Sequence, residues 1–301
     1  RQGKRAMNNF HKPVLLKEII DYLNVRKGAK YIDATLGGAG HSEEILKRGG
    51  IVLGIDVDED ALDFVRNKKN EIENWQNLIL AYGNFKDIDK IAHLNNFDKV
   101  AGIILDLGVS SFQIDTPERG FSYQKNVPLD MRMDKTLSVT AADLLKILTK
   151  GELNELFNKL GEEHSARRIS ESIVRARGIK KIETSDDLLE AIRGNKGQAS
   201  AFERAKILNK IFQALRIAVN DELNNLREVL PKAIELLDKD ANLLVISFHS
   251  LEDRIVKRAF EEYEEKSMGK ILTKKPITPD AEEMRSNSRS KSSKMRVFKK
   301  I

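Results

Sequence analysis

The sequence has no cysteine, few aromatic residues and no long apolar run. Without cysteine the chain forms neither disulfides nor thiolate metal sites, which fits a reducing compartment. Aromatic residues make up 6% of the chain and charged residues 33%, a composition typical of a helix-rich soluble protein. No apolar run approaches the roughly 20 residues that span a bilayer, and no signal peptide is visible. We therefore expect a cytoplasmic protein that makes no membrane contact.

The length of 301 residues suits two domains, or one domain with a large insertion. Residues 1–6 (RQGKRA) precede Met7, and we expect them to be a cloning remnant outside the fold. The net charge of +6 is unevenly distributed, because residues 284–301 carry seven basic residues and no acid. This segment is either a solvated, disordered tail or an arm that contacts phosphates, and composition leaves both readings open.

Apolar strand-like segments and helical segments alternate from residue 15 to residue 106. We expect strands at 30–34, 51–55, 78–81 and 101–105, and helices at 15–23, 42–47 (with Ser42 as N-cap) and 59–69. Continuously apolar strands that are separated by helices indicate a parallel sheet covered on both faces. The fold class is therefore α/β.

A block of helical sequence interrupts this alternation. Residues 135–218 have helical periodicity, a loop is expected at 194–200, and a helix at 221–237 precedes a returning strand at 243–248. The apolar stripe of the block is read as core; it consists of Leu208, Ile211, Phe212, Leu215 and Val219. We predict one discontinuous α/β domain, residues 7–134 and 213–301, that carries a helical insertion at 135–212.

The most informative short stretch is YIDATLGGAGHS, residues 31–42, in which an apolar run meets Asp33 and then a glycine-rich loop. Parallel sheets bind ligands at the carboxyl ends of their strands, and glycines let the backbone approach a ligand closely. A dinucleotide would require G-x-G-x-x-G, with its pyrophosphate on the helix N-terminus. Gly38 and Gly40 supply the first two positions, but the third is Glu43, whose carboxylate would repel a pyrophosphate. The dinucleotide fingerprint therefore fails.

S-adenosylmethionine fits this loop better, because it has no phosphate and tolerates carboxylates nearby. Its ribose hydroxyls need an acceptor at the end of the second strand, where Asp56 stands in LGIDVDED. Asp56 alone is equally an ordinary strand-terminal aspartate, but the glycine loop at the right distance favours the ribose role. Phe85, just after the third strand, either covers the adenine or belongs to the core.

The strand at 101–105 ends in Asp106 and continues as LGVSS. The exocyclic amine of a base is a poor nucleophile because its lone pair is shared with the ring, and an acceptor on its N–H groups localises that pair. The sulfonium methyl is already electrophilic, so positioning supplies most of the rate and no metal is expected. Candidate catalytic residues are Asp106, Ser110, Ser111 and His249. Asp106 alternatively binds the ammonium group of the cofactor.

Several motifs together resemble a known family. They are HKPVLL (11–16), DATLGGAGHS (33–42), LDLGVSSFQID (105–115), RGFSY (119–123), LDMRMD (129–134), FQALRIAVNDEL (212–223) and ISFHSLEDRIVK (246–257). The chain from Met7 onward resembles the bacterial small-subunit (16S) ribosomal RNA cytosine-N4 methyltransferases of the MraW/RsmH type. The resemblance implies a class I, Rossmann-like methyltransferase domain with a helical insertion.

The same resemblance implies S-adenosylmethionine as methyl donor and a decoding-region cytidine as substrate, in ribosomal RNA or in the assembled small subunit. The family's cofactor contacts correspond here to Ala39, Gly40, His41, Asp56, Phe85, Asp106 and Gln113. The resemblance also places the loop of His249 near the target base. The oligomeric state stays open, a dimer included.

Three polar groups have competing interpretations. His249 next to Ser250 would suggest a hydrolase, but no G-x-S-x-G elbow is present, and a capped strand-to-helix turn is the plain alternative. Arg132 in LDMRMD contacts a phosphate or pairs with Asp130 or Asp134, and the two carboxylates are a poor metal site. A surface that grips RNA is expected on the insertion and the basic tail, because a target cytosine must leave its stack. The insertion's candidates, otherwise merely solvated, are Arg167, Arg168, Arg175 and Arg177.

Two other functions remain open at this stage. One is a methyltransferase that acts on a DNA or protein amine. The other is a cofactor-binding RNA module without catalysis. Phosphate contacts give affinity whereas base-edge contacts give sequence choice, and the sequence supports the first much better than the second.

Overall fold

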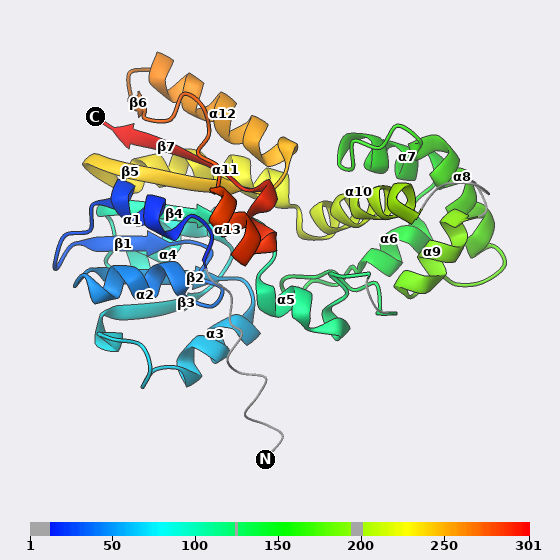
Figure 1. Cartoon of the computed structure of the whole chain (residues 1–301), viewed down its shortest axis with the longest axis horizontal. Helices are drawn as coiled ribbons and strands as arrows, with labels where there is room; N and C mark the ends of the chain where they lie inside the picture. Colours follow the sequence, from blue (N-terminus) through cyan, green and yellow to red (C-terminus); the bar gives the residue numbers. More distant parts are fainter. Residues whose placement is uncertain (1–12, 124–125, 194–200) are drawn as a thin grey trace. The chain divides into compact units, whose positions relative to one another are not determined.

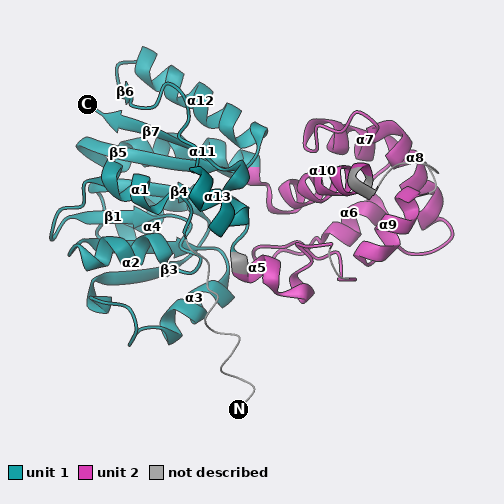
Figure 2. Cartoon of the chain, in the orientation of Figure 1, with its two compact units in different colours: residues 1–110, 223–301 teal, residues 111–222 magenta. Residues whose placement is uncertain are grey.

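The chain folds into two compact units in this computed structural model (Figure 2). The first unit comprises residues 1–110 and 223–301, and the second comprises residues 111–222. The residues that the structure describes are 13–123, 126–193 and 201–301. The predicted remnant at 1–6 and the predicted loop at 194–200 lie outside them. The second unit is larger than the predicted insertion at 135–212, because it takes in flanking residues on both sides.

The elements of the first unit alternate as an α/β domain requires. In chain order they are α1 (Leu16–Leu23), β1 (Lys30–Asp33), α2 (Gly40–Lys47), β2 (Ile51–Asp56), α3 (Glu59–Asn67), η1 (Trp75–Asn77), β3 (Leu78–Tyr82), η2 (Phe85–Asp87), α4 (Ile88–Leu94), β4 (Val100–Asp106), α11 (Glu222–Leu236), β5 (Leu237–Ser247), α12 (Ser250–Glu265), β6 (Gly269–Ile271), α13 (Ala281–Ser286), η4 (Ser288–Ser292) and β7 (Lys294–Lys300). The second unit contains α5 (Ser111–Asp115), η3 (Pro117–Arg119), α6 (Ala141–Ile147), α7 (Lys150–Lys159), α8 (Ala166–Arg177), α9 (Ser185–Arg193) and α10 (Ala201–Asn220).

The seven strands form one sheet in the order β3-β2-β1-β4-β5-β7-β6 (Figure 1). The strands from β1 to β5 pair in parallel, whereas β7 runs antiparallel between β5 and β6. The strand order reverses between β1 and β4, and sheets of this type bind ligands at such a switch point. The predicted α/β class is therefore confirmed.

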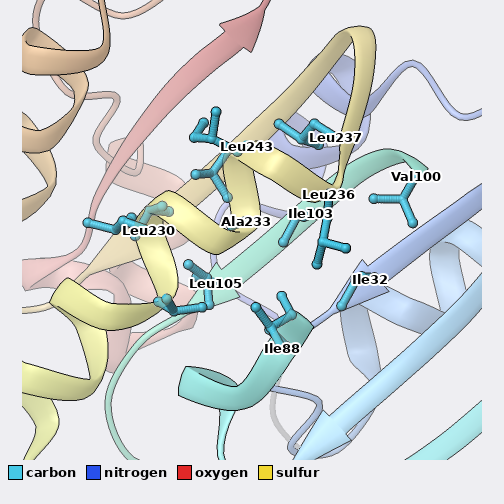
Figure 3. Packing of buried hydrophobic residues seen from close by; sticks show 14 of the residues in the cluster. Ile32, Ile88, Val100, Ile103, Leu105, Leu230, Ala233, Leu236, Leu237 and Leu243 are labelled. Carbon is cyan, nitrogen blue, oxygen red and sulfur yellow. The ribbon is translucent and has the colours of Figure 1, made fainter. Parts of the chain in front are cut away.

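Both faces of the sheet are buried, which explains why its strands are continuously apolar. Ile103 and Leu105 of β4 belong to a cluster with residues of α4, α11 and α12, part of which Figure 3 shows. Ile104 points to the opposite face and packs with residues of α1, α2 and α3. Because successive side chains of a strand alternate between faces, a strand covered twice has no polar position until it ends. Polar side chains are therefore concentrated at the strand ends.

The basic C-terminal segment is not a disordered tail, so that reading was wrong, whereas its contact with phosphates stays a prediction. It contains β7, whose Met295, Val297 and Phe298 are fully buried. Arg296 is also buried and donates to both carboxylate oxygens of Asp253 on α12, at 2.6 and 3.2 Å. The excess of basic residues drew attention away from the apolar residues that alternate with them. These apolar residues are buried because β7 pairs with β5 on one side and β6 on the other.

Replacing Arg296 with methionine is expected to destabilise the protein by about 3 kcal/mol, because it leaves the Asp253 carboxylate without its main partner. The measurement is urea unfolding followed by circular dichroism. Lys291→Met is the matched control, since Lys291 is exposed in the same segment and its loss should cost less than about 0.5 kcal/mol. Equal stability of the two variants would contradict a role for the ion pair.

The second unit is a helical bundle around its own core. The predicted apolar stripe on α10 is confirmed as core. Ile211, Phe212 and Leu215 are buried with residues of α6, α7, α8 and α9, Leu208 is also buried, and Val219 is partly buried against the same cluster. Arg177 does not contribute to a free basic face, contrary to the prediction. Its guanidinium donates to the backbone carbonyls of Leu145 and Leu148, both at 2.6 Å, and so caps the end of α6. Among the described residues, none of the helices combines the length and apolar character that a membrane crossing requires.

Candidate active site

Three aspartates end three neighbouring strands of the sheet. Asp33 ends β1, Asp56 ends β2 and Asp106 ends β4, and β1 pairs with both of the other strands. Burial is the main reason that the pKa of Asp56 and that of Asp106 each rise to about 6, and the charge of Asp33 adds to both shifts. Burial also raises the pKa of Asp33. Perturbed carboxylates that gather at a switch point indicate a functional site.

The glycine loop after β1 is tied to the end of β2 through Asp56. The backbone N–H of Gly37 donates to one oxygen of Asp56 at 2.7 Å, and the N–H of Asp58 donates to the other at 2.9 Å. Gly37 has a φ of 50°, a conformation that glycine adopts without a steric cost. Each carboxylate oxygen has two lone pairs, so Asp56 can hold the loop and still accept two hydroxyl donors.

Helix α2 begins two residues earlier than predicted, and Ser42 is not its N-cap. The N-cap is Ala39, which is buried and has a φ of 64°. A left-handed alanine costs about 1 kcal/mol, and such strain is typical of functional loops. Ser42 instead lies inside the helix and donates to Asp33 at 2.7 Å. A Cβ on Gly40 would lie 3.1 Å from the ring of Pro13, so a glycine there lets the N-terminal segment pack on the loop.

The two carboxylate oxygens of Asp106 have different surroundings. Its backbone N–H donates to the Thr35 hydroxyl at 2.7 Å, and its Oδ2 lies 3.9 Å from Nδ1 of the buried His41. Oδ1 is buried and has no hydrogen-bond partner among the residues that the structure describes. A buried acceptor without a partner is costly, and an N–H group of a ligand would satisfy it.

Two of the motifs meet beside Asp106. The N–H of Leu107 donates to the carbonyl of Ile246 at 3.0 Å. Gly108 has a φ of 97°, and a Cβ there would lie 3.4 Å from the ring of Phe248. The turn LDLG therefore packs against the turn SFHS. Ser110 lies next to the glycine loop, because a Cβ added to Gly37 would lie 3.8 Å from the Cβ of Ser110. Ser111 begins α5 in the second unit.

His249 is the N-cap of α12 and forms a capping box with Glu252. The Glu252 carboxylate accepts from the N–H groups of Phe248 and His249 at 2.8 and 3.3 Å, and the Glu252 N–H approaches Nδ1 of His249 at 3.4 Å. The capped strand-to-helix turn, the plain alternative for this motif, is thus present. A catalytic role for His249 stays a prediction.

Phe85 and Gln113, two further predicted cofactor contacts, lie in different units. Phe85 begins η2 just after β3 and is partly buried against the core cluster of β4 and α11. Gln113 is buried and lies on α5 of the second unit. Both assignments stay predictions.

Sequence reasoning missed several residues that build this site, namely Asp33, Thr35, Asp58 and Val14. Asp33 had a recognisable signal, because it directly follows the buried strand residues Tyr31 and Ile32 and directly precedes the glycine loop. Thr35 and Val14 act through a hydroxyl and a backbone carbonyl on partners that are distant in sequence, so no local pattern reveals them.

The LDMRMD motif is mainly a structural element of the second unit. Arg132 pairs with Asp130 through two hydrogen bonds of 2.8 Å, so the pairing with an aspartate is confirmed. A phosphate contact of Arg132 stays a prediction. Met131 has a φ of 63°, and its carbonyl accepts from the Asn220 side chain at 2.8 Å. Arg119 of RGFSY is buried and donates to the carbonyls at positions 132 and 133. The prediction that the chain uses no metal stays a prediction.

The sheet order, with antiparallel β7 between β5 and β6, and the glycine loop facing carboxylates after β2 and β4 define a class I S-adenosylmethionine-dependent methyltransferase. The residues present fit that cofactor, because the Asp56 carboxylate at the end of β2 offers acceptors for ribose hydroxyls beside the glycine loop. When bound, the cofactor supplies an electrophilic methyl group. The chain belongs to the MraW methylase family, whose model matches residues 8–301.

Relatives of high coverage share one name, "Ribosomal RNA small subunit methyltransferase H". The protein of this name from Persephonella marina is 45% identical over 97% of this chain and 99% of its own length. Those from Clostridium botulinum and Halothermothrix orenii are 43% and 40% identical, each over 97% of this chain and 99% and 98% of their own length. A solved rRNA methylase from Streptococcus thermophilus is 11% identical, with a TM-score of 0.43 over 94% of this chain and 95% of its own, which is too distant to support an argument.

Proposed function

We propose that this protein transfers the methyl group of S-adenosylmethionine to the N4 amine of a cytidine in the decoding region of small-subunit ribosomal RNA. The substrate class is supported by the shared name of relatives that are 40–45% identical over nearly the whole chain. The observation that supports an amine as the methyl-accepting group is the buried Oδ1 of Asp106. This oxygen has no hydrogen-bond partner among the described residues and can accept from an amine N–H. A ribosomal substrate implies a cytoplasmic protein that takes part in ribosome biogenesis.

The geometry favours amine chemistry because no donor in the described part of the chain competes for Oδ1 of Asp106. An ionised carboxylate that accepts from an exocyclic amine localises the nitrogen lone pair for in-line attack on the methyl carbon. Catalysis then consists mainly of positioning. Two reactants held in contact behave as if each were present at a very high concentration, which raises the reaction rate. A contact of Ser110 with the reacting groups is part of the proposal and is supported by its position beside Gly37 of the glycine loop. Ser111 and His249 stay predicted catalytic residues.

The test is incorporation of labelled methyl groups into four substrates: small ribosomal subunits, bare small-subunit RNA, duplex DNA and a protein mixture. The expected result is incorporation into the ribosomal substrates alone, with the label recovered as N4-methylcytidine after digestion to nucleosides. Label in DNA or protein would replace the substrate assignment. Cofactor binding without incorporation anywhere would favour a non-catalytic RNA module.

We further propose that the helical insertion at 135–212 faces the RNA, with α8 as its basic surface. Arg167, Arg168 and Arg175 are exposed along α8, and Lys180 and Lys181 are exposed just beyond it. Several of these charges have acidic neighbours, since Arg167 lies 3.4 Å from Glu171 and Lys180 pairs with Asp187. Arg168 and Arg175 are both exposed and lie seven residues apart on α8, which puts them on one face of the helix, and these two are the proposed phosphate contacts.

The double variant Arg168→Ala/Arg175→Ala is expected to weaken RNA binding at low salt and to lower the slope of log K against log salt by about 2, because each phosphate contact contributes about 1. Filter binding over a salt series measures the slope. Lys257→Ala on α12 is the control, since Lys257 is likewise exposed and pairs with a residue on its own helix. A slope identical to that of the unmodified protein would remove α8 from the RNA surface.

A further inference from the structure

The HKPVLL motif has a role in the site that its position in the sequence does not suggest. Pro13 packs on Gly40, and the carbonyl of the next residue, Val14, lies 3.0 Å from Nε2 of His41. Leu15, the next residue, has a left-handed φ of 53° and donates its N–H to Glu283 of α13 at 2.9 Å. The Val14 carbonyl is thus held between a strained residue and a packed proline.

This contact determines which nitrogen of His41 carries a proton. A carbonyl oxygen accepts and never donates, so Nε2 must be the protonated nitrogen. Nδ1 then faces Oδ2 of Asp106 at 3.9 Å, and both groups are largely removed from water. In the neutral tautomer a bare lone pair on Nδ1 faces the carboxylate, an unfavourable arrangement. A proton on Nδ1 removes that repulsion and creates an ion pair with Asp106.

We propose that His41 is a positioning residue that keeps Asp106 ionised, because the Val14 carbonyl fixes its ring so that a protonated Nδ1 faces the carboxylate. The proposal rests on the proposed function, in that an ionised Asp106 is the acceptor for the substrate amine. It assigns the N-terminal motif a role in acid–base control of the site, beyond any direct contact of His41 with the cofactor.

The charges around Asp106 oppose one another. Burial raises the pKa of Asp106 most, the charge of His41 lowers it, and the charge of Asp33 raises it, with a net value of about 6. Asp33 accepts a hydrogen bond from Ser42, and the charge of His41 also lowers the pKa of Asp33. Removing the positive charge of His41 therefore moves the pKa of Asp106 upward. Since Asp106 is ionised above its pKa, the site then loses its acceptor at a higher pH than in the unmodified protein.

The matched variant is His41→Gln, because glutamine retains an amide donor at the distance of Nε2 for Val14 but has no group at the position of Nδ1. In the free protein, the carboxyl carbon-13 resonance of Asp106, assigned with Asp106→Asn, is expected to titrate near pH 6. In His41→Gln the midpoint is expected to rise by about one pH unit. His93→Gln is the control, since His93 pairs with a different aspartate, Asp98, on the solvent-exposed surface. An unchanged midpoint in His41→Gln overturns the proposal.

Single-turnover methyl transfer provides the second readout. With cofactor at saturation, His41→Gln should react about fivefold more slowly than the unmodified protein at pH 6 and within about twofold at pH 8.5. A rise of the Asp106 pKa from about 6 to about 7 lowers the ionised fraction about fivefold at pH 6 and hardly at all at pH 8.5. In the Asp106→Asn background, His41→Gln should cause no further pH shift. An equal loss at every pH would show a purely structural role and overturn the proposal.

The two proposals can fail separately. A displaced carboxyl titration in a protein that methylates no ribosomal substrate would support the His41–Asp106 pair and contradict the proposed function. If His41→Gln does not fold, nitrogen-15 imidazole spectra of the unmodified protein decide. The proposal expects a proton on Nε2 of His41 at every pH, and a tautomer with the proton on Nδ1 alone overturns it.

Discussion

Replacing Asp56 with alanine is expected to weaken S-adenosylhomocysteine binding about 100-fold. The variant loses the acceptor for the ribose hydroxyls and leaves the N–H groups of Gly37 and Asp58 without their partner. Hydrogen bonds to a charged group contribute about 1.5 kcal/mol or more each, so two lost bonds correspond to about 3 kcal/mol. Titration calorimetry measures the affinity, and circular dichroism confirms that the variant is folded.

Glu59→Ala is the control for this experiment, because Glu59 is an exposed acid in the first turn of α3, three residues beyond Asp56. Its affinity should stay within about twofold, since exposed ion pairs contribute little. Asp56→Asn retains one acceptor oxygen and should lie between the two. An unchanged affinity of the alanine variant would remove Asp56 from the ribose role.

Replacing Asp106 with asparagine is expected to lower the single-turnover rate of methyl transfer by about 10² to 10³, the range that positioned acid–base groups supply. The amide cannot act as an ionised acceptor for the substrate N–H, and its own N–H₂ group competes for the same position. The variant should still bind S-adenosylhomocysteine within a few-fold, as measured by calorimetry alongside rapid-quench kinetics.

The balance between rate and affinity distinguishes the two roles of Asp106. A large loss of affinity with a normal rate at saturation would show that Asp106 binds the cofactor's ammonium group and is not the amine acceptor. Asp98→Asn is the control, because Asp98 is an exposed aspartate that pairs with His93. Its rate and affinity should match those of the unmodified protein.

Much of the first unit could be predicted because its signals are local. The strands β1, β2 and β4 are short apolar runs that end at an aspartate, and helices with one apolar face separate them. In a parallel sheet the carboxyl ends of neighbouring strands lie at one edge, so Asp56 and Asp106 could be placed near the glycine loop before their distances were known.

The errors all arose where a partner distant in sequence decides the structure. Serine is a common N-cap residue, but the Ser42 hydroxyl donates to Asp33 and the helix begins at Gly40. Arg177 is one of several surface arginines by sequence, yet it caps α6. The C-terminal segment has an excess of charge by composition, and β5 and β6 make it a central strand.

The sequence by itself determined the alternating architecture, the glycine loop and the acidic strand ends, because periodicity, glycine and burial act over a few residues. The tertiary structure alone decided which polar atoms meet: that Val14 orients His41, that His41 faces Asp106, and that Asp253 holds Arg296. The physical reason is that hydrogen bonds and ion pairs depend on distances of a few ångströms, and residues tens of positions apart in the chain reach such distances only when the sheet and its helices have packed.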